Sequence, residues 1–323
     1  MNKKIDKKAV VSGFNRAAHS YDESAVLQQE VGRRLLERLQ WIKIKPKTIL
    51  DLGSGTGAAT LELQKMYPDA QVYAVDIAEQ MLILSRNKHH LQTQRESSFI
   101  QRIAEKISTK KSKKIHYICG DAENLPLINQ HFDLVYSNLA IQWCESTQKL
   151  FNQLQRVLSP TGCLLFSSFG VDTLMELKQS WADDPLAAVD STQIDEDSSH
   201  VNEFVVMHEL GDVMLQSGLV DPVMDSDKII MEYTELSLLF KDLKQIGAQN
   251  HLQNRSKGLT SKSKYKTMLK NYEQFKLSNG KYPATYDVVY GHAWGRNLKV
   301  GAQKGNTNMT INPHEQLISF VKK

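Results

Sequence analysis

Short apolar runs alternate with stretches of helical periodicity along the first half of the chain. The runs occupy residues 48–53, 71–77, 115–121, 132–138 and 162–170. Helical patterns separate them at residues 58–67, 79–88 and 146–158. Alternation of this kind is typical of βαβ units. It therefore predicts an α/β fold in which parallel strands form a doubly wound sheet with helices on both faces.

The regions outside this alternation complete the predicted organisation. Near the N-terminus, apolar residues recur at helical spacing at Val26, Val31, Leu35, Leu36 and Leu39. A helix at 207–219 and strands at 223–233 and 284–294 bring the sheet to seven strands. The predicted units are an N-terminal helical segment covering the site (1–45), the sheet core (46–170), an acidic insertion with a helix and the sixth strand (171–234), a basic helical lid (235–281), the last strand (282–296) and a C-terminal tail (297–323).

Composition is that of an ordinary globular protein. Of the 323 residues, 41% are hydrophobic and 24% are charged, enough for one large domain with an added lobe. No apolar run reaches the roughly 18 to 20 residues that a membrane span needs, and the first residues lack the apolar stretch of a signal peptide. We therefore expect a cytoplasmic protein with no membrane partner. Cys119, Cys144 and Cys163 form no CxxC pair, so we expect free buried thiols and no metal site.

Charge is distributed unevenly, although the net charge is only +4. Seven acidic residues and no Lys or Arg lie between Asp183 and Glu203, whereas residues 241–281 carry ten Lys or Arg and two acidic residues. The predicted lid is therefore strongly positive. A further basic and polar block at residues 102–114 predicts an exposed insertion or flexible loop.

A glycine-rich turn follows the first apolar run, in the sequence ILDLGSGTGAAT (49–60). Glycine permits backbone conformations and a close approach that a Cβ atom would obstruct. The spacing is GxGxG and not the GxGxxG of dinucleotide-binding proteins, which argues against NAD. Asp76 ends the second run, and Asp121-Ala122 ends the third. Because parallel strands end at the same edge of a sheet, these residues are expected to converge on one nucleoside.

This arrangement resembles the class I S-adenosylmethionine-dependent methyltransferases between residue 48 and about residue 170. The resemblance implies Asp51 and Gly53 near the amino-acid portion of the cofactor, Asp76 on the ribose, and Asp121 with Ala122 at the adenine. The expected cofactor-binding residues are Asp51, Gly53, Ser54, Gly55, Gly57, Asp76, Ile77, Asp121, Ala122 and Asn138. Two alternatives stay open: a turn of this type without a ligand, and an Asp76 that only caps a helix.

The stretch SNLAIQWC (137–144) bears on the acceptor. Methyltransferases that act on bases or glutamine side chains usually carry Pro-Pro-Tyr/Phe after the Asn, Asp or Ser at this place, and this chain has Asn138-Leu139-Ala140. The stretch is instead similar to the malonyl-acyl-carrier-protein O-methyltransferases of biotin synthesis. Further matches are FNRAAHSYD (14–22), KQIGAQN (244–250) and GKYPATYDVVYG (280–291). Departures are the insertion near 92–114, the acidic stretch near 183–203 and the C-terminal tail.

The second resemblance implies that the substrate is malonyl-acyl carrier protein, and that the products are its methyl ester and S-adenosylhomocysteine. A carboxylate is already ionised near pH 7, so no general base is expected. The candidate positioning residues are Tyr21, Asn138, Gln142 and Trp143. Tyr21 and Trp143 could instead be packing residues, and Gln142 could cap backbone groups. Arg16 could pair with the malonyl carboxylate or form a surface salt bridge.

The basic lid could meet the acidic carrier protein by charge complementarity. The expected docking residues are Arg255, Lys262, Lys264, Lys266 and Lys270. A solvated lysine-rich face is the alternative, and nucleic acid is not expected, because stacking aromatics do not interleave with these lysines. Three rival functions stay open. The first is a protein-modifying enzyme like the similar complex I assembly factor, which is linked to arginine hydroxylation. The others are methylation of a quinone precursor or other metabolite, and a cofactor-binding scaffold without turnover.

Overall fold

The computed structural model describes residues 5–96, 115–182, 201–202, 204–248, 250–253 and 260–296. Several predicted features lie outside these residues: the block at 102–114, the seven acidic residues from Asp183 to Glu203, Arg255 and the tail from residue 297.

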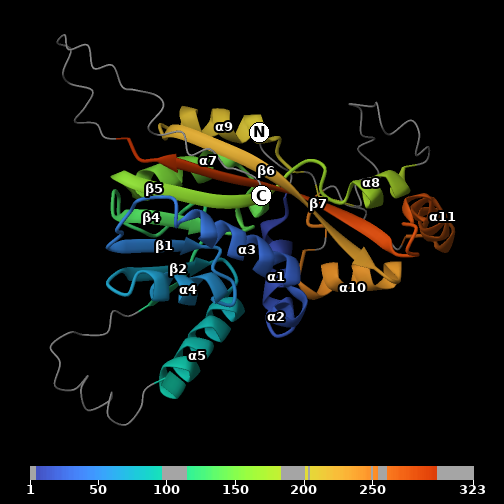
Figure 1. Ribbon diagram of the computed structural model, residues 1–323, viewed down its shortest axis with the longest axis horizontal. Coiled ribbons are helices and arrows are strands. Elements are labelled where there is room, and N and C mark those ends of the chain that lie inside the picture. Colours follow the sequence, from blue (N-terminus) through green and yellow to red (C-terminus); the bar gives the residue numbers. More distant parts are fainter. Residues whose placement is uncertain are drawn as a thin grey trace.

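Seven strands form one mixed sheet in the order β3-β2-β1-β4-β5-β7-β6 (Figure 1). The strands are β1 (Thr48–Leu52), β2 (Gln71–Asp76), β3 (His116–Cys119), β4 (Phe132–Ser137), β5 (Leu158–Phe169), β6 (Val220–Tyr233) and β7 (Tyr282–Trp294). The first five are parallel, whereas β7 runs antiparallel to both β5 and β6. The predicted seven-stranded α/β fold is confirmed.

Helices cover both faces of the sheet because the central strands are apolar on both sides. Ile49 and Leu134 point to the face packed by α3 (Val26–Arg38) and α4 (Ala58–Met66), where α5 (Glu79–Glu96) also contributes a buried leucine. Leu50 of β1 points to the other face. That face is packed by α7 (Thr147–Val157) and α9 (Met207–Gln216). Strands buried on both faces are typical of parallel sheets, and this sandwich fixes the strand ends that carry the site.

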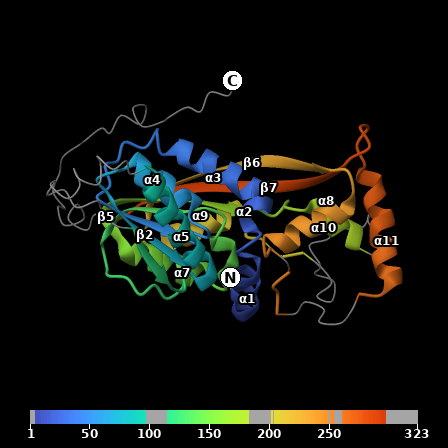
Figure 2. The same cartoon turned by 90° about the horizontal axis from the view of Figure 1, so that it is seen from below.

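Strands β6 and β7 extend beyond the rest of the sheet. β7 pairs with β5 only from Val288 onward, but it pairs with β6 along its whole length from Tyr282. Around this extension lie α8 (Met175–Trp181), α10 (Leu236–Gln245), α11 (Lys262–Tyr272) and the short η3 (Glu273–Phe275). Of the predicted basic lid, α10 lies along this arm, and α11 lies at the end of the arm that is far from the parallel strands (Figures 1 and 2).

The N-terminal segment forms α1 (Lys7–Ala17) and α2 (Tyr21–Ser24) before α3. The backbone N–H of Asp6 donates to the carbonyl of His251 over 2.8 Å, and Ile5 forms an isolated bridge with Leu252. A Cβ atom on Gly247 would lie 3.2 Å from the backbone of Gly13, so the two segments approach closely. Helix α1 is thus fastened to residues 246–252, and both pass beside the carboxyl edge of the sheet.

Three local expectations need correction. Val26 is 57% exposed, because it lies at the start of α3 and the buried stripe begins with Leu27. Cys119 is exposed at the end of the edge strand β3, although Cys144 and Cys163 are buried. Strand β5 begins at Leu158 and includes Pro160, since the pairing with β4 is irregular there and leaves no ladder hydrogen bond for a proline to break.

None of the described helices is long and apolar enough to span a membrane.

Candidate functional site

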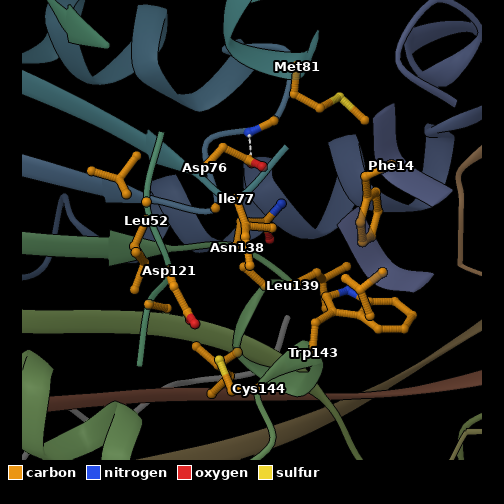
Figure 3. A pocket seen from close by; sticks show the side chains of 18 of the residues that line it. Phe14, Leu52, Asp76, Ile77, Met81, Asp121, Asn138, Leu139, Trp143 and Cys144 are labelled. Atoms are coloured by element: carbon orange, nitrogen blue, oxygen red, sulfur yellow. Dashed lines mark hydrogen bonds between the residues drawn. The ribbon is translucent and has the colours of Figure 1, made fainter. Parts of the chain in front are cut away.

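A pocket opens where β1, β2, β3 and β4 end, and α1 and the first residue of α2 cover it (Figure 3). The predicted residues that line it are Tyr21, Gly53, Gly55, Asp76, Ile77, Asp121, Ala122, Asn138 and Trp143. The predicted residues that do not line it are Asp51, Ser54, Gly57 and Gln142. Most of the residues chosen from the sequence are therefore brought together at one place.

The glycine-rich turn folds back against the end of β2. The N–H of Gly53 and the N–H of Ser54 both donate to the carbonyl of Val75, over 2.8 and 3.1 Å. Gly53, Gly55 and Gly57 all have positive φ, which side chains rarely adopt. A Cβ atom on Gly55 would meet nothing within 4 Å, so the backbone of this residue faces open space in the pocket. The turn can therefore admit a ligand directly against its main chain.

Asp76 joins this turn to the start of α5. One carboxylate oxygen accepts the N–H of Gly55 and the other accepts the N–H of Ala78, each over 2.8 Å; the bond to Gly55 is visible in Figure 3. Burial raises the pKa of Asp76, and the backbone hydrogen bonds oppose that shift. The residue thus forms the turn that precedes α5 and also lines the pocket, so the two interpretations of Asp76 are compatible.

Asp51 lies on the other side of β1 from the pocket, because successive strand residues alternate and Leu52 takes the lining position. Its carboxyl oxygen accepts the hydroxyl of Thr60 in α4 over 2.5 Å, and its exposure is 1%. Burial raises the pKa of Asp51 to about 7, against the effect of the Thr60 hydrogen bond. The expectation that Asp51 touches the cofactor is therefore not supported by its position, since it holds the helix beneath the glycine-rich turn.

The Asp51→Asn variant should change how stability depends on pH. The folded state raises the pKa of Asp51 to about 7, so above an unfolded pKa of about 3.9 the folded protein binds more protons than the unfolded chain. The free energy of unfolding then falls as the pH rises through this window. At about 1.4 kcal/mol per pKa unit, wild type should lose roughly 2 kcal/mol more than Asp51→Asn between about pH 5 and about pH 7. Urea unfolding at both pH values measures this, and equal losses would contradict it.

Asp121 is held by a lysine that the sequence did not single out. Lys7 of α1 contacts a carboxylate oxygen of Asp121 at 2.6 Å and one of Glu123 at 2.6 Å. Burial lowers the pKa of Lys7, but its hydrogen bonds to both carboxylates outweigh burial and raise it. Glu123 also accepts the N–H groups of Glu145 and Ser146, each over 2.9 Å. The start of α1 is thus anchored to the loop after β3, at the end of the pocket that is expected to hold the adenine.

Aromatic side chains form the opposite end of the pocket. The ring of Trp143 meets the ring of Phe14 edge-on at 5.4 Å and the ring of His251 at 5.6 Å (Figure 3 shows the first pair). Tyr21 lies in the same wall, and burial, followed by the charges of Asp76 and Asp22, raises its pKa far above the usual value. Tyr21 therefore stays protonated at any working pH and can donate a hydrogen bond.

Asn138 lines the pocket, but its amide is already engaged. Its Nδ2 donates to the carbonyl of Gln28 over 3.0 Å, and its Oδ1 accepts the hydroxyl of Ser167 over 2.8 Å. The side chain therefore ties the end of β4 to α3 and β5. One amide hydrogen and one lone pair are left for a ligand.

Gln142 does not line the pocket in this structure. Gln142 is 4% exposed in the short helix η1 (Ile141–Trp143), and its Nε2 donates to the carbonyl of Leu139 over 2.8 Å. It caps the backbone behind the pocket, which is the alternative that the sequence left open. Gln142 and Trp143 are consecutive residues of this tight helix, so their side chains point in different directions.

Known proteins resemble this chain along most of its length. The family model described as "Methyltransferase domain" matches residues 50–166. A malonyl-acyl-carrier-protein O-methyltransferase from Nitrosospira multiformis is 42% identical over 293 residues, which cover 90% of this chain and 89% of that protein. The chain belongs to the malonyl-acyl-carrier-protein O-methyltransferase family. A second member, from Gallionella capsiferriformans, is 43% identical and covers 90% of this chain and 91% of its own length.

Solved structures agree on the fold of this family member. The YcgJ protein from Bacillus subtilis superposes with a TM-score of 0.52 at 15% identity, covering 81% of this chain and 98% of that one. The cofactor is S-adenosylmethionine. The pocket fits it, because Gly55 leaves open space against its main chain. Asp76 and Asp121 would hold the ribose and the adenine.

Three contributors to the site were missed or undervalued in the sequence. Lys7 lies in a lysine-rich start that carries no periodic signal, and His251 is isolated in a polar stretch. Phe14 was quoted only as part of the FNRAAHSYD match; it lies on α1, whereas Tyr21 begins α2. Arg16, a candidate partner of the malonyl carboxylate, is exposed and does not line this pocket. Within the described residues, no group of three or more side chains could hold a metal ion.

Proposed function

We propose that the protein transfers the methyl group of S-adenosylmethionine to the free carboxylate of malonyl-acyl carrier protein and so forms a methyl ester used in biotin synthesis. The observation that carries this proposal is the chemistry of the acceptor end. The pocket residues around the Trp143 ring, which we take as the acceptor end, include Phe14, Tyr21, Asn138 and Leu139. None of these side chains can accept a proton near neutral pH, because the pKa of Tyr21 is raised.

An acceptor that carries its own negative charge therefore suits this end of the pocket. When bound, S-adenosylmethionine supplies a methyl group on a sulfonium, which an ionised carboxylate can attack without a general base. The pocket residues would align the two groups and exclude water, and this alignment supplies most of the acceleration. Phe14 and Trp143 provide the apolar wall, and Tyr21 and Asn138 provide hydrogen-bond donors.

The charge of the malonyl carboxylate would be balanced by the sulfonium itself. Lys7 is the only cationic side chain among the described lining residues, and two carboxylates already hold it. A permanent lysine or arginine partner would lower the reactivity of a carboxylate nucleophile by stabilising its charge before the reaction. The lining therefore favours an anionic acceptor over a neutral ring or amine, which would need a base.

A transfer assay tests this function. The protein is incubated with methyl-labelled S-adenosylmethionine and malonyl-acyl carrier protein, and label is expected in an ester that mild base releases. Acetyl-acyl carrier protein, which lacks the free carboxylate, is the matched control and should acquire no label. Label on a quinone precursor but not on the malonyl thioester would contradict the proposal and favour metabolite methylation. The proposal also places the protein in the cytoplasm, without a nucleic-acid partner.

Tyr21→Phe should slow the reaction more than it weakens cofactor binding. Loss of a hydrogen bond to a charged group costs about 1.5 to 3 kcal/mol, so kcat/KM should fall roughly 10- to 100-fold. Tyr265→Phe is the matched control, because Tyr265 is 40% exposed on α11. Calorimetry with S-adenosylhomocysteine should give a nearly unchanged Kd for both variants. Full activity of Tyr21→Phe would leave Tyr21 as a packing residue.

A further inference from the structure

A second hollow runs along the outer side of α1. Its wall on the helix includes Lys8, Ser12, Asn15 and Arg16, and we call this hollow the outer groove. Lys7, Ile77 and Asp121 line both the outer groove and the cofactor pocket. The two hollows therefore adjoin along one flank of α1, and a chain-like ligand could pass from one to the other.

The outer groove is positively charged. Lys8 and Arg16 are exposed and eight residues apart, with Ser12 midway, so all three lie on one face of the helix. Arg16 donates from Nε to the carbonyl of Ser12 over 3.2 Å, which leaves its terminal guanidinium nitrogens directed elsewhere. Among the described residues, neither Lys8 nor Arg16 forms a salt bridge. The acidic residue of the groove, Asp121, is paired with Lys7.

The opposite flank of α1 is closed. Asp6 is hydrogen-bonded to His251, Gly13 approaches Gly247 closely, and the hydroxyl of Ser20 donates to the carbonyl of Gln245 over 3.2 Å. These contacts bring Gln245, Gly247 and His251 against the N-terminal segment. The flank that carries the outer groove is held by separate polar contacts, such as the bond from Gln80 N–H to Asn15 over 2.9 Å.

We propose that the outer groove binds the phosphodiester of the prosthetic arm that carries the malonyl group, while the thioester end of the arm reaches into the pocket. This inference rests on the proposed function and names the place where the carrier-protein substrate enters. Arg and Lys side chains form short, charge-assisted hydrogen bonds with phosphate oxygens, and a guanidinium can do so with two nitrogens. Ser12 and Asn15 supply further polar groups in the same hollow.

The predicted docking helix α11 fits this task less well. Its lysines Lys262, Lys264, Lys266 and Lys270 are all exposed. However, no described residue of α11 lines the pocket or the outer groove, and the helix lies at the far end of the β6–β7 arm (Figures 1 and 2). It can attract an acidic carrier protein at long range, but it does not adjoin the cavity.

The test compares two pairs of exposed cations with substrates that differ by one phosphate. Lys8→Ala/Arg16→Ala is the groove variant, and Lys264→Ala/Lys266→Ala is the matched control on α11. Each is assayed with malonyl-phosphopantetheine and with malonyl-pantetheine, which lacks the phosphate. The groove variant should lose roughly 10-fold or more in kcat/KM with the phosphorylated thioester, because a hydrogen bond to a charged group is worth about 1.5 to 3 kcal/mol. It should change less than about twofold with malonyl-pantetheine, and the control variant should match wild type on both.

Other outcomes would overturn the inference. Equal losses on both thioesters would mean that the variant damages the pocket, and no loss on either would remove the phosphate from the groove. A loss confined to malonyl-acyl carrier protein would assign the groove to the surface of the carrier. A loss in the α11 variant alone would return docking to α11. Failure of the proposed function looks different, since wild type would then methylate none of the malonyl thioesters.

Discussion

Asp76→Ala is expected to weaken binding of S-adenosylmethionine by roughly 100-fold or more. The variant removes a carboxylate that can accept two ribose hydroxyls, and each such bond to a charged group is worth about 1.5 to 3 kcal/mol, with tenfold in affinity for every 1.4 kcal/mol. It also removes the acceptor of the Gly55 N–H, so the glycine-rich turn loses one of its hydrogen bonds to β2. Calorimetric titration with S-adenosylmethionine measures the effect.

Two further variants separate these contributions. Asp76→Asn keeps one acceptor oxygen and replaces the other with an NH2 group, so it should preserve part of the turn and lose an intermediate amount of affinity. Glu79→Ala removes an exposed carboxylate three residues further along and should bind the cofactor as wild type does. An Asp76→Ala protein with near-native affinity would show that the ribose does not lie against this carboxylate.

Gly53→Ala is expected to destabilise the fold by roughly 2 to 5 kcal/mol. A Cβ atom at this position would lie 2.2 Å from the Cβ of Ala140, and the backbone has a φ of +71°. The left-handed backbone alone costs a residue with a side chain about 1 to 2 kcal/mol, and a forced contact in a packed interior costs about 1 to 3 kcal/mol more. Urea unfolding monitored by tryptophan fluorescence gives the difference.

Gly55→Ala is the matched comparison on the same turn. Its φ is +53°, but an added Cβ atom would meet nothing within 4 Å. Stability should therefore fall by only about 1 to 2 kcal/mol. Cofactor affinity should fall by more than this loss of stability accounts for, because the new methyl group enters the pocket. If Gly55→Ala binds the cofactor normally, the ligand does not approach this part of the main chain.

The sheet was predictable because each of its signals is local. Apolar runs such as FDLVYS, with helical patterns between them, indicate parallel strands whichever residues lie next to them in space. The convergence of Asp76 and Asp121 followed as well, since parallel strands end at one edge. These inferences use only the order of elements along the chain.

The acceptor end was less accessible to sequence reasoning, because it depends on contacts between distant segments. Gln142 and Trp143 are neighbours in the sequence, yet only Trp143 reaches the pocket. Lys7 acquires its role from Asp121 and Glu123, more than a hundred residues away, and nothing in a lysine-rich start distinguishes it from Lys8. Local periodicity cannot report which side of a short helical turn meets another element.

The attachment of α1 to residues 246–252 also has a consequence for the order of folding. Contacts such as Asp6 with His251 join segments that are separated by most of the chain, and closing so long a loop costs entropy that local contacts do not repay. The parallel strands can pair as soon as their βα units exist. Helix α1, which covers the pocket, can be held in place only after residues 246–252 have been synthesised. We therefore expect a newly made chain to pair its parallel strands β1 to β5 before it can retain cofactor.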